Sequence, residues 1–82
     1  MSQLKEIILP KELGESMVVL WYKELGEFFE EEETLVEVQT EKVTFEVPAP
    51  FSGVLSEIKV KRGETATGGE IIATAQIAKT TV

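Results

Sequence analysis

The chain of 82 residues contains no cysteine and no histidine. Without cysteine, neither a disulfide nor a thiolate metal site can form. Without histidine, the chain lacks the commonest protein metal ligand and the side chain best suited to proton transfer near neutral pH. We therefore expect no metal site and neither Ser-His nor Cys-His catalysis, and a free-standing enzyme is the least favoured kind of function.

Basic residues are scarce as well. Eight lysines and arginines face 15 aspartates and glutamates, which gives a formal net charge of −7. Nucleic acid and anionic membrane surfaces would repel such a domain, so we expect neither as a partner and favour a protein partner with a basic face.

Long apolar runs are also missing, because no window reaches the roughly 18 apolar residues of a membrane span. The first 15 residues are too short and too acidic for a signal peptide. These two observations predict a cytoplasmic domain of bacterial type, or a domain of the mitochondrial matrix if a transit peptide has been removed.

Short apolar runs separated by glycine and proline fill most of the chain, and they favour an all-β sandwich or barrel. Residues 23–35, "KELGEFFEEEETL", could be mistaken for a helix, but the clustered glutamates and Gly26 argue for strand, loop and strand. Gly68 and Gly69 are expected to serve a turn, and Trp21 to anchor the core. About eight short strands are expected, six of them at residues 5–9, 17–22, 34–40, 43–47, 53–60 and 71–77, with a loop at 65–70.

An internal repeat becomes visible when the chain is shifted by 37 positions. Gly26 then falls on Gly63, and many apolar positions fall on apolar positions; further identities include Glu27 on Glu64, Glu33 on Glu70, Gln39 on Gln76 and Lys42 on Lys79. The repeat predicts two similar four-stranded halves around a pseudo-twofold axis. Gly26 and Gly63 should occupy equivalent turns with positive φ.

The stretch "VQTEKVTFEVPAPFSG", residues 38–53, predicts a hairpin with Glu41-Lys42 at its tip. If Val38 faces Phe45 and Glu37 faces Glu46, the two strands sort into one apolar and one polar side. A surface lysine at a turn is ordinary. This turn, however, has no Asn or Gly, so we expect it to accept a backbone cost for the sake of a function.

The motifs "LGES", "W.K.LG", "LVEVQTEKVTFEVPAPFSGVLSEI" and the final "G..I" resemble the lipoyl domains of the 2-oxoacid dehydrogenase acyltransferases. The resemblance covers about residues 5–77. It implies a flattened barrel of two four-stranded antiparallel sheets with quasi-twofold symmetry, formed by residues 1–78, followed by a linker or tail at 79–82. It also implies that Lys42 carries lipoic acid in an amide bond. Thr40, Glu41 and Val43 would be flanking recognition residues, although Glu41 stands where the family usually has Asp.

The same resemblance implies a carrier that has no catalytic residue of its own. Its partners would be a lipoylating ligase or transferase, a thiamine-diphosphate-dependent 2-oxoacid decarboxylase, the acyltransferase catalytic core and dihydrolipoyl dehydrogenase, with the isolated domain monomeric. The loop at residues 9–16 would be read by the decarboxylase through Leu13, Gly14, Glu15 and Ser16, unless it is a plain connector.

Four alternatives stay open at this point. A biotin carrier domain has the same fold, but it typically places methionines where Glu41 and Val43 stand. An unmodified barrel could act as an interaction or spacer module. The lipoylated carrier of glycine cleavage is larger than this chain, and a nucleic-acid-binding barrel conflicts with the net charge of −7.

Overall fold

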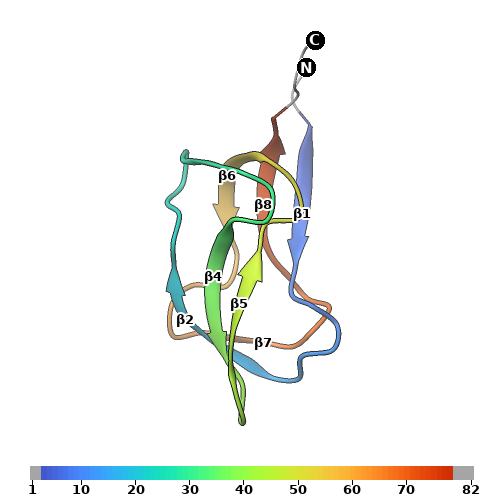
Figure 1. Ribbon diagram of the computed structural model, residues 1–82, viewed down its shortest axis with the longest axis vertical. Helices are drawn as coiled ribbons and strands as arrows, with labels where there is room; N and C mark the ends of the chain where they lie inside the picture. The colour runs from blue at the N-terminus through green and yellow to red at the C-terminus, as the bar shows by residue number, and fades with distance from the viewer. Residues whose placement is uncertain (1–2, 79–82) are drawn as a thin grey trace.

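The computed structural model describes residues 3–78, and these form two four-stranded antiparallel sheets packed face to face (Figure 1). One sheet, with strand order β1-β8-β6-β3, holds the first and last strands and is called the terminal sheet here. The other, with order β5-β4-β2-β7, is called the hairpin sheet. The strands are β1 Leu4–Ile8, β2 Ser16–Trp21, β3 Phe28–Phe29, β4 Thr34–Gln39, β5 Thr44–Pro48, β6 Gly53–Ile58, β7 Thr65–Ala66 and β8 Ile71–Ile77.

This architecture confirms the predicted all-β fold. The six expected strands are all present within two residues of their predicted ends, and residues 23–35 contain β3 and the start of β4 rather than a helix. The sequence prediction missed β7, which lies inside the expected loop at 65–70. Two residues are too few to show a period-2 pattern, so the alternation signal could not reveal it.

The predicted pseudo-twofold repeat is confirmed in the backbone. A shift of 37 residues carries β2 onto β6 and β3 onto β7, strand end for strand end. It also carries the bulge between Val18 and Leu20 onto the bulge between Leu55 and Glu57. Lys79, which the repeat aligns with Lys42, and the predicted tail at 79–82 lie outside the described residues.

Four turns related by this repeat share one construction. Each closes with a backbone hydrogen bond between its first and fourth residues, and each has a positive φ at its third residue, as a type II turn requires. In each turn a glutamate carboxylate also accepts a hydrogen bond from the backbone N–H three residues earlier. The third residues are Gly26 (φ 85°), Glu32 (φ 74°), Gly63 (φ 87°) and Gly69 (φ 94°). Gly26 and Gly63 are as predicted, whereas Glu32 takes a conformation that favours glycine.

The core lies between the two sheets and is almost entirely aliphatic. Phe29 is its largest fully buried side chain, and burial of each such side chain stabilises the fold by about 1.5–3 kcal/mol. Trp21 is partly buried, packs against this core and donates its indole N–H to the Val60 carbonyl at 2.9 Å. The interpretation of Trp21 as a core anchor is therefore confirmed. The fully enclosed aliphatic side chains include Ile7, Leu9, Val18, Leu35, Val36, Val38, Leu55 and Ile72.

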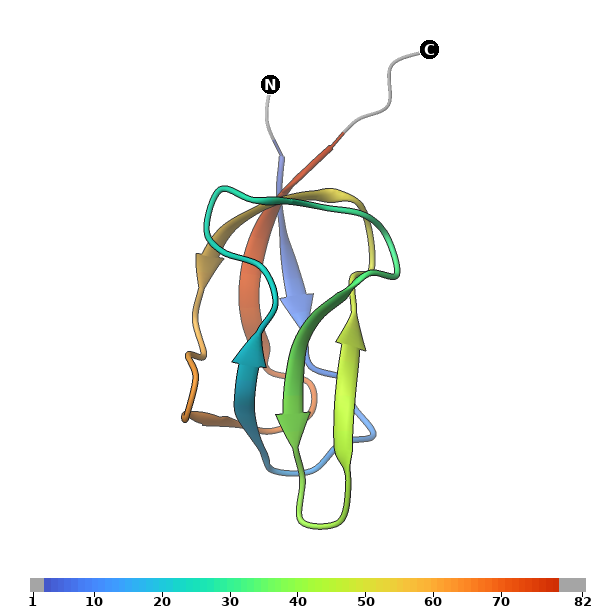
Figure 2. The same ribbon diagram turned by 60° about the vertical axis from the view of Figure 1, so that its left-hand side comes forward.

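The β4–β5 hairpin projects from one end of the barrel, and β1 begins and β8 ends at the opposite end (Figures 1 and 2). The hairpin tip therefore lies at the opposite end of the barrel from the start of β1 and the end of β8. Residues 3–78 include no helix of the length and apolar character that a membrane crossing requires.

Candidate functional site

The β4–β5 hairpin has the register that its alternation predicted. Val38 pairs with Phe45 and Glu37 with Glu46. On the inner side Val38 is buried and Phe45 is partly buried against the core, while Glu46 on the outer side is exposed. A bulge near the start of β4, which the alternation did not predict, lets the consecutive residues Leu35 and Val36 both point inward. A well-packed base therefore supports the exposed tip.

The hydroxyl of Thr40 organises the tip. Its Oγ1 donates to the Val43 carbonyl at 3.0 Å and accepts from the Val43 N–H at 3.1 Å and the Lys42 N–H at 3.3 Å. The Thr40 N–H donates to the same Val43 carbonyl at 2.8 Å. The Thr40 side chain thus provides hydrogen bonds for the backbone groups of this turn, in a place where many hairpins use an Asn-Gly pair to form the turn.

This arrangement corrects the expectation that the tip accepts a backbone cost. Neither Glu41 nor Lys42 has a positive φ, and among residues 3–78 only Glu32 is a non-glycine residue in that region. Because the Thr40 hydroxyl accepts the amide bonds, the chain turns without the left-handed conformation that a two-residue primed turn needs.

Lys42 lies at the tip and its side chain is exposed. None of the three ion pairs within residues 3–78 involves it, so its amine is held by no carboxylate of the described chain. An exposed, unpaired primary amine on an ordered turn fits a group attached through an amide bond. The surroundings show no apolar burial that would make this lysine a nucleophile by itself.

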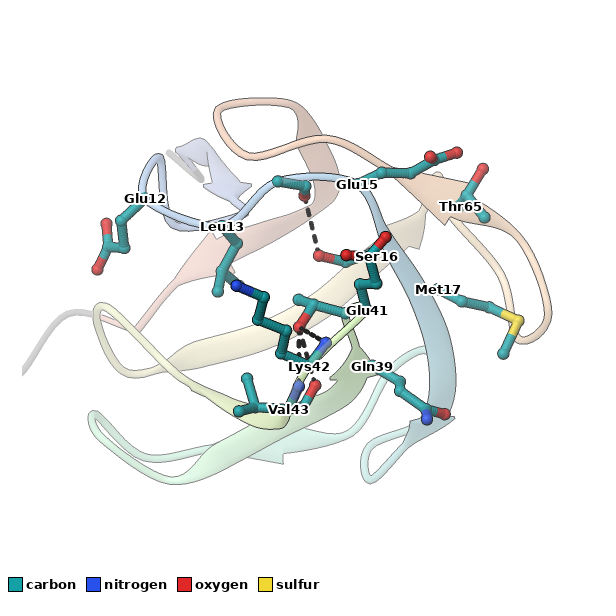
Figure 3. Close-up of a pocket in the computed structure, with 12 residues that line it drawn as sticks. Glu12, Leu13, Glu15, Ser16, Met17, Gln39, Glu41, Lys42, Val43 and Thr65 are labelled. Carbon is teal, nitrogen blue, oxygen red and sulfur yellow. Dashed lines mark hydrogen bonds between the residues drawn. The ribbon is translucent and has the colours of Figure 1, made fainter.

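An open groove runs between the tip and the loop at residues 9–16 (Figure 3). The Lys42 side chain extends across it toward Leu13 (Figure 3). The groove is lined by Glu12, Leu13, Gly14, Glu15, Ser16 and Met17 on one side, Gln39, Thr40, Glu41, Lys42 and Val43 on the other, and Thr65.

The loop that forms one wall of this groove is tied to the turn after β7. The N–H groups of Gly68 and Gly69 donate to the carbonyls of Leu13 and Leu9, at 3.0 and 2.8 Å. A Cβ on Gly68 would lie only 2.1 Å from the Leu13 carbonyl oxygen, so no larger residue fits without moving the loop. Gly68 and Gly69 therefore form a turn, as predicted, and they also fix the groove wall.

The four residues expected to form a recognition loop are placed differently from one another. Gly14 and Glu15 are exposed, while Leu13 is partly buried against the core. Ser16 begins β2, is buried, and donates its hydroxyl to the Gly14 carbonyl at 3.0 Å. Gly14 and Glu15 are thus open to a partner, whereas Ser16 shapes the loop from beneath.

Of the flanking residues, Thr40 is partly exposed and Glu41 and Val43 are exposed, with 55% of Val43 open to solvent. The groove also brings in Glu12, Met17 and Thr65, which the sequence reasoning did not select. Alternation along β2 does predict that Met17 points away from the core. Its closeness to the tip depends on tertiary packing that no local pattern reveals.

Comparison with known proteins agrees with this geometry. The family profile described as "Biotin-requiring enzyme", of the biotin/lipoyl type, matches residues 5–75. The chain belongs to the biotin/lipoyl attachment family.

Its relatives within this family include acyltransferase components of 2-oxoacid dehydrogenase complexes. The succinyltransferase component of the 2-oxoglutarate dehydrogenase complex of Bacillus subtilis is 38% identical over 90% of this chain. The corresponding protein of Buchnera aphidicola is 39% identical over 78%, and the acetyltransferase component of the pyruvate dehydrogenase complex of Corynebacterium glutamicum is 42% identical over 76%. The matches span 18%, 16% and 10% of these relatives' own lengths, so the chain corresponds to a small part of each.

Solved structures give the same result. The lipoyl domain of the 2-oxoglutarate dehydrogenase complex from Azotobacter vinelandii superimposes with a TM-score of 0.67 at 32% identity, covering 85% of this chain and 92% of that one. A region of a single-chain long-chain acyl-CoA carboxylase superimposes with a TM-score of 0.79, covering 94% of this chain and 7% of that one. At 16% identity, the second likeness concerns the fold alone. The domain is therefore a lipoyl domain related to those of 2-oxoacid dehydrogenase acyltransferases.

Proposed function

We propose that this domain is a lipoyl carrier in which the Nζ atom of Lys42 forms an amide with lipoic acid. The observation that supports this most is the exposed, unpaired amine of Lys42 at the end of an ordered hairpin. The Thr40 hydroxyl orders the backbone of that tip through its hydrogen bonds to Val43. Thr40, Glu41 and Val43 flank this amine, and we assign them to recognition by the lipoylating enzyme, a ligase or a transferase.

Lipoate attached there would supply a dithiolane that can take up an acyl group together with two electrons and later be reoxidised. The proposed partners are a thiamine-diphosphate-dependent 2-oxoacid decarboxylase, an acyltransferase core that passes the acyl group to coenzyme A, and dihydrolipoyl dehydrogenase. The domain itself supplies position. The stiff hairpin keeps the arm in solvent, and tethering to a complex raises the concentration of the arm at each active site.

The loop beside the tip suits recognition by the decarboxylase. It forms one wall of the groove across which Lys42 extends, and Gly14 and Glu15 present their surfaces there. Ser16 is buried, so its role would be to hold the Gly14 carbonyl in place through its hydroxyl. Leu13 is partly buried, so only its solvent-exposed atoms would contact the decarboxylase.

Lipoate is favoured over biotin because Glu41 and Val43 stand where the biotin carriers typically have methionine. It is favoured over an unmodified spacer because the tip sequence resembles that of lipoylated domains and because the Lys42 amine takes part in no ion pair within residues 3–78. The relatives are bacterial acyltransferase components, so we assign the domain to a dihydrolipoyl acyltransferase that works in the bacterial cytoplasm or, in a eukaryote, in the mitochondrial matrix.

The experiment is incubation of the 82-residue chain with a lipoate–protein ligase, ATP and lipoate, followed by intact-mass and peptide mass spectrometry. We expect a single lipoyl addition at Lys42, one of seven lysines. The Lys42→Arg variant keeps the charge and should gain nothing. A parallel reaction with a biotin–protein ligase and biotin should leave the chain unmodified. Addition at another lysine, or faster biotinylation than lipoylation, contradicts the proposal.

A further inference from the structure

The outer face of the hairpin sheet carries an apolar stripe along β2. Met17 and Leu20 of β2, and Tyr22 directly after its last residue, point to this side, and 41%, 41% and 44% of their surfaces are exposed. At about 3.3 Å per residue the stripe is about 17 Å long. Met17 also lines the groove beside Lys42, so the stripe is continuous with the modification site. These three residues are called the β2 stripe below.

An acidic pair lies beside the β2 stripe. Glu37 faces Glu46 in the β4–β5 ladder, and Leu20 pairs with Glu37 from the other side. Like charges directly opposite each other destabilise a sheet. Neither carboxylate takes part in the ion pairs found within residues 3–78. Glu37 does accept a hydrogen bond from the Tyr22 hydroxyl at 2.9 Å, and this bond, with the two negative charges, raises the pKa of Tyr22.

The pseudo-twofold axis supplies an internal comparison for this face. In the terminal sheet the row equivalent to Glu46, Glu37 and Leu20 is Glu6, Thr74 and Glu57. The equivalent of Tyr22 is Lys59, whose Nζ lies 3.6 Å from the Glu57 carboxylate. In the terminal sheet, Thr74 therefore separates the two carboxylates, and Lys59 forms an ion pair with one of them. In the hairpin sheet the two carboxylates are direct neighbours and neither has an ion-pair partner within residues 3–78.

The exposed apolar residues of the terminal sheet are also arranged differently. Leu4 and Ile8 lie on β1 and Phe28 lies on β3, at the two opposite edges of that sheet. The central strands between these edges present polar residues such as Thr74 and Gln76. A continuous apolar stripe next to an unneutralised acidic pair thus distinguishes the sheet that bears Lys42.

Whichever enzyme attaches lipoate has to choose Lys42 among the seven lysines of the chain. It acts before any prosthetic group is present, so the protein surface is all that it can read. Glu46 lies four residues from Lys42 along the hairpin, a distance of about 13 Å, well inside the footprint of an enzyme docked at the tip.

We propose that the β2 stripe and the Glu37–Glu46 pair form the surface on which the lipoate-attaching enzyme seats the domain. The complementary surface of that enzyme would be an apolar patch bordered by arginine or lysine side chains. This inference rests on the proposed lipoylation of Lys42. With a ligase, the Lys42 amine attacks the carbonyl carbon of lipoyl adenylate, the amide bond forms, AMP leaves, and the amine nitrogen loses its proton to solvent.

The charge part is tested with the double variant Glu37→Gln, Glu46→Gln and its symmetry-matched control Glu6→Gln, Glu57→Gln. Both remove two negative charges from one row of one sheet, so both change the net charge equally. The measured quantity is the initial rate of lipoyl addition by a lipoate–protein ligase at limiting chain concentration, followed by intact mass. We expect the hairpin-sheet variant to react about tenfold more slowly at low salt, with the difference shrinking at high salt, and the control to react at the wild-type rate.

The apolar part is tested with Leu20→Ser against Leu4→Ser, since Leu4 is an exposed leucine of the terminal sheet. Only Leu20→Ser should lower the rate. Relief of the Glu37–Glu46 repulsion should raise the thermal stability of the double variant Glu37→Gln, Glu46→Gln. Slower modification of this double variant therefore cannot come from unfolding. Equal rates for the hairpin-sheet variants and their controls overturn this inference while wild-type lipoylation still supports the proposed function. Failure of the wild type to be lipoylated contradicts the proposed function itself.

Discussion

Replacement of Thr40 by valine should loosen the hairpin tip while the barrel stays folded. Valine keeps the shape and β-branching of threonine but removes the hydroxyl that makes three hydrogen bonds across the turn. Glu41, Lys42 and Val43 are exposed, so little apolar burial holds the tip closed once this hydroxyl is gone.

The size of the effect follows from those bonds. A net contribution of about 0.5–1.5 kcal/mol each is usual, and solvent access and the 3.3 Å length of one bond reduce the total to about 1.4 kcal/mol. The ratio of ordered to frayed tip should then fall about tenfold. The global free energy of unfolding should change by less than about 0.5 kcal/mol, because the tip can open without opening the core.

Amide hydrogen exchange at residue 40 measures this opening directly. The backbone N–H of residue 40 donates to the Val43 carbonyl whichever side chain stands at position 40. A loss of protection therefore reports opening of the tip rather than loss of the hydrogen-bond partner of this amide. Protection should fall about tenfold in Thr40→Val and stay near wild type in Thr40→Ser, which keeps the hydroxyl. Unchanged protection in Thr40→Val, or equal losses in both variants, would refute the assignment of the hydroxyl as the organiser of the tip.

Two further predictions concern the symmetric turns. Glu32→Gly should raise the free energy of unfolding by about 1 kcal/mol, because Glu32 has a φ of 74°, and Gly69→Ala at the equivalent position should lower it by a similar amount. Urea denaturation gives both values, and destabilisation by Glu32→Gly would contradict the prediction. The N–H of Glu30, and then the Lys23 amine at 2.9 Å, hold the pKa of the Glu33 carboxyl below its usual value. A depressed carboxyl pKa stabilises the fold above the unfolded-state pKa, and this contribution is lost as pH falls through the folded-state pKa. Glu33→Gln should therefore be less stable than wild type at pH 7 and equally stable near pH 2, and a difference that persists at low pH would count against this cause.

Much of the fold could be predicted because one face of each strand is buried. The pairing of Val38 with Phe45 follows from period-2 alternation, since a slip of one residue would send the apolar set of a strand to solvent. The repeat was readable for a similar reason. Its turn glycines need a special backbone conformation, so Gly26 and Gly63 recur at the same spacing as the strands.

Features that depend on tertiary contacts could not be predicted in the same way. The β7 strand, Thr65–Ala66, is too short to carry a pattern and exists because β2 offers it a partner. The positive φ of Glu32 breaks the glycine rule, so the residue type at this turn gave no sign of it. At the site, the position of Lys42 was predictable from alternation, whereas the hydroxyl cap by Thr40 and the groove wall held by Gly68 were not.

The central claim is that the geometry of the hairpin selects one amine. Its most direct test exchanges the two tip residues, as Glu41→Lys with Lys42→Glu, which leaves composition and net charge unchanged. The measurement is the initial rate of lipoyl addition to the exchanged chain and to the wild type, with chemical denaturation to establish that both are equally stable. We predict a rate at least about tenfold lower in the exchanged chain, because its amine leaves the turn in a different direction. An equal rate at equal stability would contradict the claim that the hairpin positions the amine.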